Sequence, residues 1–226
     1  MIKAVIFDLD GTILDSLDAF WRAFNAGVAT FKLRPVAKER LLALMNRGAG
    51  LAEILGEFYP ALKAEPASLI EAIKVDIRKE YLARSEDEVE LTSGAQEMLS
   101  HLRLRGLKIG VVTSRTMPPE RQWCELTKLQ VAHFIDVMVT GAKARRKPAP
   151  DTIIECLKRL ELLPGECILV GDSQVDIIAG RAAGVRTVAV ATGVTHLEAL
   201  AAESPDFIFD NLHGFLDKLD LILGGY

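Results

Sequence analysis

The sequence contains few cysteines and histidines, and neither residue type has the spacing of a structural metal site. The four histidines are scattered, so we expect none of them to be catalytic. The cysteines show no paired spacing and fall inside apolar patterns, at Cys124, Cys156 and Cys167. We therefore expect buried free thiols, which are typical of a reducing cytoplasm.

Long apolar runs and an excess of charge of one sign are also missing. No stretch approaches the ~20 apolar residues of a membrane helix, and Asp8 and Asp10 interrupt the start where a signal peptide would need apolar residues. The 27 basic and 31 acidic residues leave a net charge of −4, which gives no basis for binding nucleic acid. We expect a cytoplasmic protein with neither a membrane nor a nucleic acid as partner, and its oligomeric state stays open.

The most informative stretch is the apolar run 4–7, which ends in Asp8 and Asp10 and is followed by Gly11 and Thr12. Such a run is typical of a buried parallel strand. Side chains alternate along a strand, so both carboxylates should point to one side at its carboxyl end, where open α/β sheets bind ligands. Two neighbouring carboxylates repel each other and call for a cation or a shared proton. The alternative is an Asp-Gly turn with solvated acids.

The order of the expected elements indicates an α/β protein with an inserted domain. Residues 15–88 show only helical and loop patterns, whereas helices and strands alternate from Leu91 onward. With 226 residues, half of them hydrophobic, the chain is long enough for a core and a smaller insertion. We predict a doubly wound parallel-sheet, Rossmann-like core from residues 1–14 and 89–226, and a small all-helical domain from residues 15–88.

Polar residues suited to a phosphoryl group follow three further predicted strands. These residues are Thr113 and Ser114, the proline-flanked Lys147, and Asp172 with Asp176. Each has a simpler explanation, such as capping the next helix, and the basic residues Lys143, Arg145 and Arg146 are typical of a solvated surface. Together at one sheet edge, however, these acids, hydroxyls and Lys147 would form an anion-binding and cation-binding site.

Four segments resemble, in order, the motifs of the haloacid dehalogenase superfamily: 7–16 (FDLDGTILDS), 112–114 (VTS), 147–151 (KPAPD) and 171–176 (GDSQVD). The helical insertion is similar to the cap domain of the phosphoglycolate phosphatase and β-phosphoglucomutase branch. The resemblance implies a Mg²⁺-dependent phosphatase that acts on a small phosphorylated metabolite. It would work through an aspartyl-phosphate intermediate.

The resemblance also implies roles for single residues. Asp8 would be the nucleophile, and Asp10 would act as general acid and then as general base. Lys147 would be catalytic and, with Thr113 and Ser114, would bind the phosphoryl oxygens. Many relatives carry Asn at the position of Ser114.

The metal and the cap complete this expectation. Mg²⁺ would be held by Asp8, the backbone carbonyl of Asp10, and Asp172. Asp176 would orient a metal-bound water or the lysine of the third motif. Arg47, in a glycine-rich break between two helices of the insertion, is our candidate for contacting a substrate anion.

Two alternatives remain open at this point. A phosphomutase of the β-phosphoglucomutase type would use the same acids and differ only in its cap. A phosphate-binding protein without activity is disfavoured by the complete set of acids. Dehalogenases and phosphonatases lack an acid at the position of Asp10, so this residue favours cleavage of a P–O bond.

Overall fold

The computed structural model describes residues 1–142, 144–193 and 195–224, so Lys143 of the predicted basic run lies outside it. The chain divides into two compact units. The first, which we call the core unit, comprises Met1–Asp15 and Glu90–Tyr226. The second, the helical unit, is Ser16–Val89.

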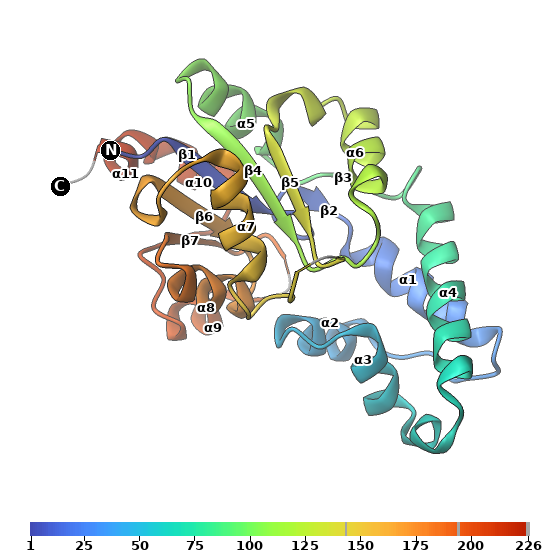
Figure 1. Cartoon of the computed structure of the whole chain (residues 1–226). Helices are drawn as coiled ribbons and strands as arrows, with labels where there is room; N and C mark the ends of the chain where they lie inside the picture. Colours follow the sequence, from blue (N-terminus) through green and yellow to red (C-terminus); the bar gives the residue numbers. More distant parts are fainter. Residues whose placement is uncertain (143, 194, 225–226) are drawn as a thin grey trace. The chain divides into compact units, whose positions relative to one another are not determined.

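The core unit is built on a parallel sheet with the strand order β5-β4-β1-β6-β7-β8 (Figure 1). The strands are β1 (Ala4–Asp8), β4 (Lys108–Thr113), β5 (Val137–Thr140), β6 (Cys167–Gly171), β7 (Arg186–Val190) and β8 (Phe207–Phe209). Every neighbouring pair is parallel. The predicted α/β class with a doubly wound parallel sheet is confirmed.

Helices cover both faces of this sheet. The longer helices are α5 (Ala95–Leu104), α6 (Pro119–Lys128), α7 (Asp151–Leu160) and α8 (Gln174–Ala183). Shorter ones are α9 (Leu197–Ala202), α10 (Leu212–Asp217), α11 (Leu219–Gly224) and the 3₁₀ turns η2 (Ala132–Phe134) and η3 (Pro164–Glu166). Figure 1 shows α7 and α8 on one face and α5 and α10 on the other.

The pleat of β1 determines which face each of its side chains meets. Ala4 and Ile6 belong to the buried cluster formed with α7 and α8. Asp8 is two residues beyond Ile6, and alternation therefore directs its side chain toward that same face. β1 ends at Asp8, and Asp10 follows two residues later as a single β-bridge residue paired with Leu14, directly before the turn that starts at Gly11.

The register brings the carboxyl ends of the central strands to one edge. Asp8 of β1 is opposite Val112 of β4, one residue before Thr113. On the other side of β1, Phe7 is opposite Val170 of β6, and Gly171 follows. The residues that come directly after these strands therefore gather at this edge of the sheet.

Several small features of the core unit were not predicted, among them a pair of short strands and a short helix. Strands β2 (Leu14–Asp15) and β3 (Glu90–Leu91) form an antiparallel pair. Two-residue strands are too short to show an alternating pattern, and their pairing spans the whole insertion. Helix α9 is only six residues long, so it also lacks a readable apolar face.

The helical unit is all-α and has a core of its own. It comprises α1 (Leu17–Ala29), α2 (Lys38–Asn46), α3 (Leu51–Phe58), η1 (Pro60–Ala64) and α4 (Ala67–Arg84). Phe24 is fully buried in this core, with Phe20 and Trp21 packed against it. These aromatic residues therefore form part of the core of the helical unit.

The prediction for the cysteines is correct for two of three. Cys156 and Cys167 are buried free thiols, whereas Cys124 on α6 is exposed. The apolar neighbours of Cys124 suggested burial, but the helix turns its side chain away from Leu126, which is buried. Among the described residues, we find no helix with both the length and the apolar character needed to cross a membrane.

Candidate active site

The centre of the site is a buried lysine shared by two carboxylates. The Lys147 ammonium donates hydrogen bonds to Asp8 Oδ1 and, at 2.5 Å, to Asp176 Oδ1. Lys147 is only 3% exposed, and Asp8 and Asp176 are 6% and 1% exposed. Lys147 follows β5, Asp8 ends β1 and Asp176 is in the first turn of α8, so the sheet edge brings together three distant segments.

Asp172 is the third buried acid, held between the motif at the first strand and the loop after β7. The Thr12 hydroxyl donates to Asp172 Oδ1 at 2.9 Å. If Gly11 were replaced by a residue with a Cβ atom, that atom would lie only 2.6 Å from Asp172 Oδ2, and a Cβ at Gly193 would lie only 1.8 Å from it. Gly11 also has a φ of +84°, so this turn requires glycine on two grounds. The Asp172 carboxylate is thus fixed in a space that only glycines leave open.

Both oxygens of Asp176 have partners. Oδ1 accepts from Lys147, and Oδ2 accepts from the Ser173 backbone N–H at 3.1 Å and from the Ser173 hydroxyl. Ser173 is the N-cap of α8, and Asp176 is three residues later, which is the spacing of a capping box. Asp176 therefore links the start of α8 to the buried lysine.

Burial and neighbouring charges both shift the pKa values of Asp8 and Lys147. Burial raises the pKa of Asp8 well above its usual range; Lys147 opposes this rise, and the neighbouring carboxylates Asp176, Asp172 and Asp10 add to it. Burial by itself would lower the pKa of Lys147, but its ion pairs and hydrogen bonds with Asp176 and Asp8 raise it above the usual range. The lysine therefore stays charged, while Asp8 lies among more negative charge than Lys147 neutralises.

We predict a pH-dependent loss of stability for the metal-free protein. A carboxyl whose pKa is raised in the folded state binds more protons there than in the unfolded chain, so the free energy of unfolding falls as pH rises through that window. For Asp8 the window starts near the ordinary pKa of 3.8 and extends upward. Urea unfolding with EDTA at a series of pH values measures this slope, and Asp8→Asn should flatten it. An equal slope in Asp8→Asn would contradict the assignment to Asp8.

The three acids also have the chemistry of a divalent-cation site. One carboxylate oxygen from each of Asp8, Asp172 and Asp176 lies within 4.8 Å of the others, and all three side chains are buried. Carboxylate oxygens are the ligands that Mg²⁺ prefers. Three buried carboxylates with one lysine leave excess negative charge that a divalent cation would neutralise. The donor set fits Mg²⁺.

Asp10 is held by an arginine that was not predicted as a site residue. Arg115 Nε is 2.9 Å from Asp10 Oδ2, and Arg115 Nη2 is 2.5 Å from Asp10 Oδ1. The remaining nitrogen, Nη1, is 2.5 Å from Glu125 Oε2 on α6. Asp10 is the most exposed of the three side chains, at 25%, against 12% for Arg115 and 10% for Glu125.

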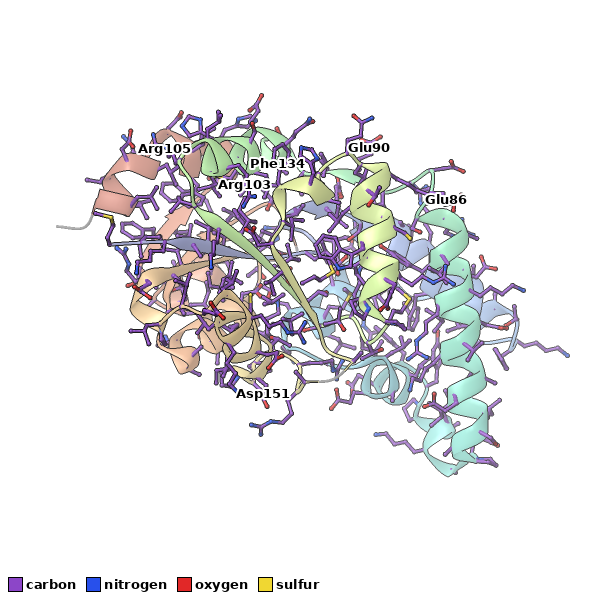
Figure 2. The ribbon with its side chains drawn as sticks, turned by 45° about the horizontal axis from the view of Figure 1, so that its top comes forward. Glu86, Glu90, Arg103, Arg105, Phe134 and Asp151 are labelled. Carbon is purple, nitrogen blue, oxygen red and sulfur yellow. The ribbon has the colours of Figure 1, made fainter. Side chains whose placement is uncertain are left out.

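The other predicted site residues lie in different surroundings. Thr113 ends β4 fully buried, and its hydroxyl accepts the Arg115 backbone N–H at 3.1 Å. Ser114 follows, half-buried. Arg47 is exposed at the C-cap of α2 and belongs to the helical unit, whereas the sheet belongs to the core unit. In the basic run, exposed Arg145 pairs with Asp151 at 2.8 Å, at the start of α7 where Figure 2 labels this aspartate.

Four residues of this edge had no predicted role: Thr12, Arg115, Glu125 and Gly193. Thr12 was already within the first motif, and Arg115 is adjacent to Thr113 and Ser114, so position was a usable signal for both. Glu125 and Gly193 carried no signal, because their contacts depend on how α6 and the loop after β7 pack.

Comparison with known proteins agrees with this arrangement. A model of the family described as haloacid dehalogenase-like hydrolase matches residues 5–190, which include every acid of the site. This chain belongs to the haloacid dehalogenase-like hydrolase family. The resemblance noted for the four sequence motifs is thereby confirmed.

Individual members of the hydrolase family align over nearly the whole chain. A Clostridium perfringens protein named as a pyrophosphatase, PpaX, is 33% identical, and the alignment covers 98% of each chain. A Salmonella typhimurium phosphoglycolate phosphatase is 28% identical over 97% of this chain and 93% of its own. A Haemophilus somnus crystal structure described as a predicted phosphoglycolate phosphatase has a TM-score of 0.83 at 25% identity, covering 96% and 97% of the two chains.

Proposed function

We propose that this protein is a phosphatase that hydrolyses small phosphomonoesters through a phosphoenzyme intermediate on Asp8. The observation that carries the proposal is the buried cluster in which Lys147 joins Asp8 and Asp176 beside Asp172. A lysine and a divalent cation at one carboxylate supply the positive charge that a phosphate dianion needs to approach it.

In the first half-reaction, Asp8 attacks phosphorus and the bond from phosphorus to the leaving oxygen breaks. Asp10 gives its proton to that oxygen, so the alcohol leaves neutral. Lys147 fixes the Asp8 carboxylate through Oδ1, and with Thr113 and Ser114 it binds the phosphoryl oxygens as their charge spreads.

In the second half-reaction, water replaces Asp8 on phosphorus. Asp10, now ionised, takes a proton from the attacking water, the bond between phosphorus and the Asp8 oxygen breaks, and inorganic phosphate leaves. The acid of the first step is thus the base of the second. Mg²⁺, held by Asp8, the Asp10 backbone carbonyl and Asp172, would supply charge neutralisation when bound, with Asp176 orienting Lys147.

The substrate class is a small phosphorylated metabolite. The full-length relatives are named for phosphoglycolate and pyrophosphate, both small anions. We assign the helical unit as a cap that excludes water from the site and selects the substrate, with Arg47 as the group for an anionic part of the substrate. A panel containing phosphoglycolate, pyrophosphate, sugar phosphates and nucleotides, assayed for phosphate release with Mg²⁺, tests the proposal. Failure to release phosphate from any of them would contradict it.

The phosphomutase alternative has weaker support. The Clostridium perfringens and Salmonella typhimurium relatives are named as a pyrophosphatase and a phosphoglycolate phosphatase, whereas the similar structure named as a β-phosphoglucomutase is only 24% identical. Incubation with a hexose 1-phosphate distinguishes the two reactions. Free phosphate without an isomerised sugar supports the phosphatase, and isomerised product would support the mutase.

The role of Asp10 predicts a dependence on the leaving group. For Asp10→Asn, we expect kcat/KM for an alkyl phosphate to fall about 10²-fold or more, because the alkoxide then leaves without a proton. The fall for p-nitrophenyl phosphate should be much smaller, because nitrophenolate needs no proton to leave. Asp217→Asn, at an exposed aspartate on α10, is the matched control and should keep both rates. Equal losses for the two substrates would count against the acid role.

A further inference from the structure

We infer that Arg115 is a positioning residue that fixes the carboxylate of Asp10 in its working orientation, with Glu125 as its anchor on α6. The inference rests on the proposed function, because it concerns the residue assigned there as acid and base. Arg115, in the loop after β4, and Glu125, on α6, would then join the residues that support catalysis at the sheet edge.

The first observation is the bidentate contact between the Arg115 guanidinium and the Asp10 carboxylate. Nε reaches Oδ2 at 2.9 Å and Nη2 reaches Oδ1 at 2.5 Å, so one planar guanidinium meets both carboxylate oxygens. A parallel pair of bonds of this kind fixes the rotation of the carboxylate as well as its position. A lysine could supply the charge but not this geometry.

The second observation is that Asp10 needs an external support. Asp10 lies beyond the end of β1, as a single bridge residue directly before the turn at Gly11, which has a positive φ. Its side chain is the least buried of the acids at this edge, with 25% exposure. An aspartate side chain that is partly exposed outside a regular strand has several accessible rotamers, and proton transfer needs one of them.

The third observation is that Arg115 is itself held in place. Its Nη1 contacts Glu125 Oε2 at 2.5 Å, and its backbone N–H donates to the Thr113 hydroxyl at 3.1 Å. Glu125 is 10% exposed and belongs to a regular helix, so it is a rigid anchor. The chain of contacts therefore runs from α6 through the guanidinium to the turn after β1.

This arrangement leaves Asp10 able to exchange a proton. Each carboxylate oxygen has two lone-pair positions, and Arg115 occupies one on each. In the working enzyme, we expect the leaving oxygen or the attacking water to approach one of these oxygens at its second position. Arg115 thus restricts the direction of the carboxylate without blocking it.

Arg115→Ala tests the inference through the leaving-group comparison. We expect kcat/KM for an alkyl phosphate to fall about 100-fold, the scale of a misplaced catalytic group, and the value for p-nitrophenyl phosphate to fall less than about 10-fold. KM should change little, because Arg115 acts on Asp10 and not on the substrate. Glu125→Gln should show a smaller loss in the same direction, and adding it to Arg115→Ala should cause little further loss.

Rescue and a matched control separate positioning from folding. Millimolar guanidinium chloride should restore part of the alkyl phosphate activity of Arg115→Ala, and Arg115→Lys should remain impaired because it cannot form both bonds. Arg103→Ala removes a comparable contact with Asp136, in which Nη1 is 2.9 Å and 2.8 Å from the two oxygens, and should keep both activities. Figure 2 labels Arg103 on α5, away from Asp151 at the start of α7.

If the wild-type protein releases phosphate, two results would overturn the inference about Arg115. Equal losses for both substrates without guanidinium rescue would show a structural role only. A raised KM with unchanged kcat would show that Arg115 contacts the substrate instead. Absence of phosphate release from the wild-type protein would be a failure of the proposed function, so the two failures are distinct.

Discussion

Asp8→Asn is expected to lower phosphate release on the order of 10⁴-fold or more, the scale of loss when an enzyme loses its nucleophile. Asparagine keeps the shape of the side chain, but its amide oxygen is too weak a nucleophile to attack phosphorus. The measurement is a single-turnover assay with excess enzyme, combined with acid quench to detect labelled phosphoryl groups on the protein. Wild type should carry label on Asp8, and the variant should carry none.

The stability of Asp8→Asn shows whether its loss of activity is caused by misfolding. Burial raises the pKa of Asp8, so the ionised carboxylate opposes folding at neutral pH when no cation is bound. Asp8→Asn should therefore be at least as stable as wild type in EDTA, which separates a chemical defect from misfolding. Asp217→Asn should retain full turnover. Label on another side chain of Asp8→Asn would refute the assignment of the nucleophile.

The sheet-edge residues were predictable because each follows a recognisable strand. Asp8, Thr113 and Asp172 come at or directly after an apolar run, and parallel strands place such positions at one edge. Lys147 comes several residues after its predicted strand, so the pattern placed it only loosely at this edge, and its role was implied by the resemblance of its motif. The parallel sheet itself was readable because its strands and helices alternate with short connections.

The support around Asp10 could not be predicted from pattern. Arg115 and Asp10 are 105 residues apart, and their contact depends on the turn at Gly11 and on the packing of α6. The pairing of β2 with β3 could not be predicted either, because a strand of two residues is too short to show an alternation of apolar and polar residues. Periodicity determines which face a residue occupies, but it does not determine side-chain rotamers or loop packing.

Lys147→Met is expected to impair both stability and catalysis. Methionine fills a similar volume but leaves the buried carboxylates Asp8, Asp172 and Asp176 without the cation that pairs with two of them. Removal of one partner of a buried ion pair destabilises a protein by about 3–5 kcal/mol, and we expect a loss of this order in urea unfolding with EDTA. Turnover should fall about 10²–10³-fold, because the developing charge on the phosphoryl oxygens loses a fixed donor.

A surface lysine provides the matched control for this prediction. Lys3 pairs with Glu166 at 2.5 Å but is 57% exposed, so Lys3→Met should change stability by less than about 1 kcal/mol. Adding Asp8→Asn to Lys147→Met should recover part of the lost stability, since it removes one of the unpaired carboxylates. Mg²⁺ should likewise stabilise Lys147→Met more than wild type. If Lys147→Met unfolded in EDTA at the same urea concentration as wild type, the ammonium could not be the group that holds these acids together.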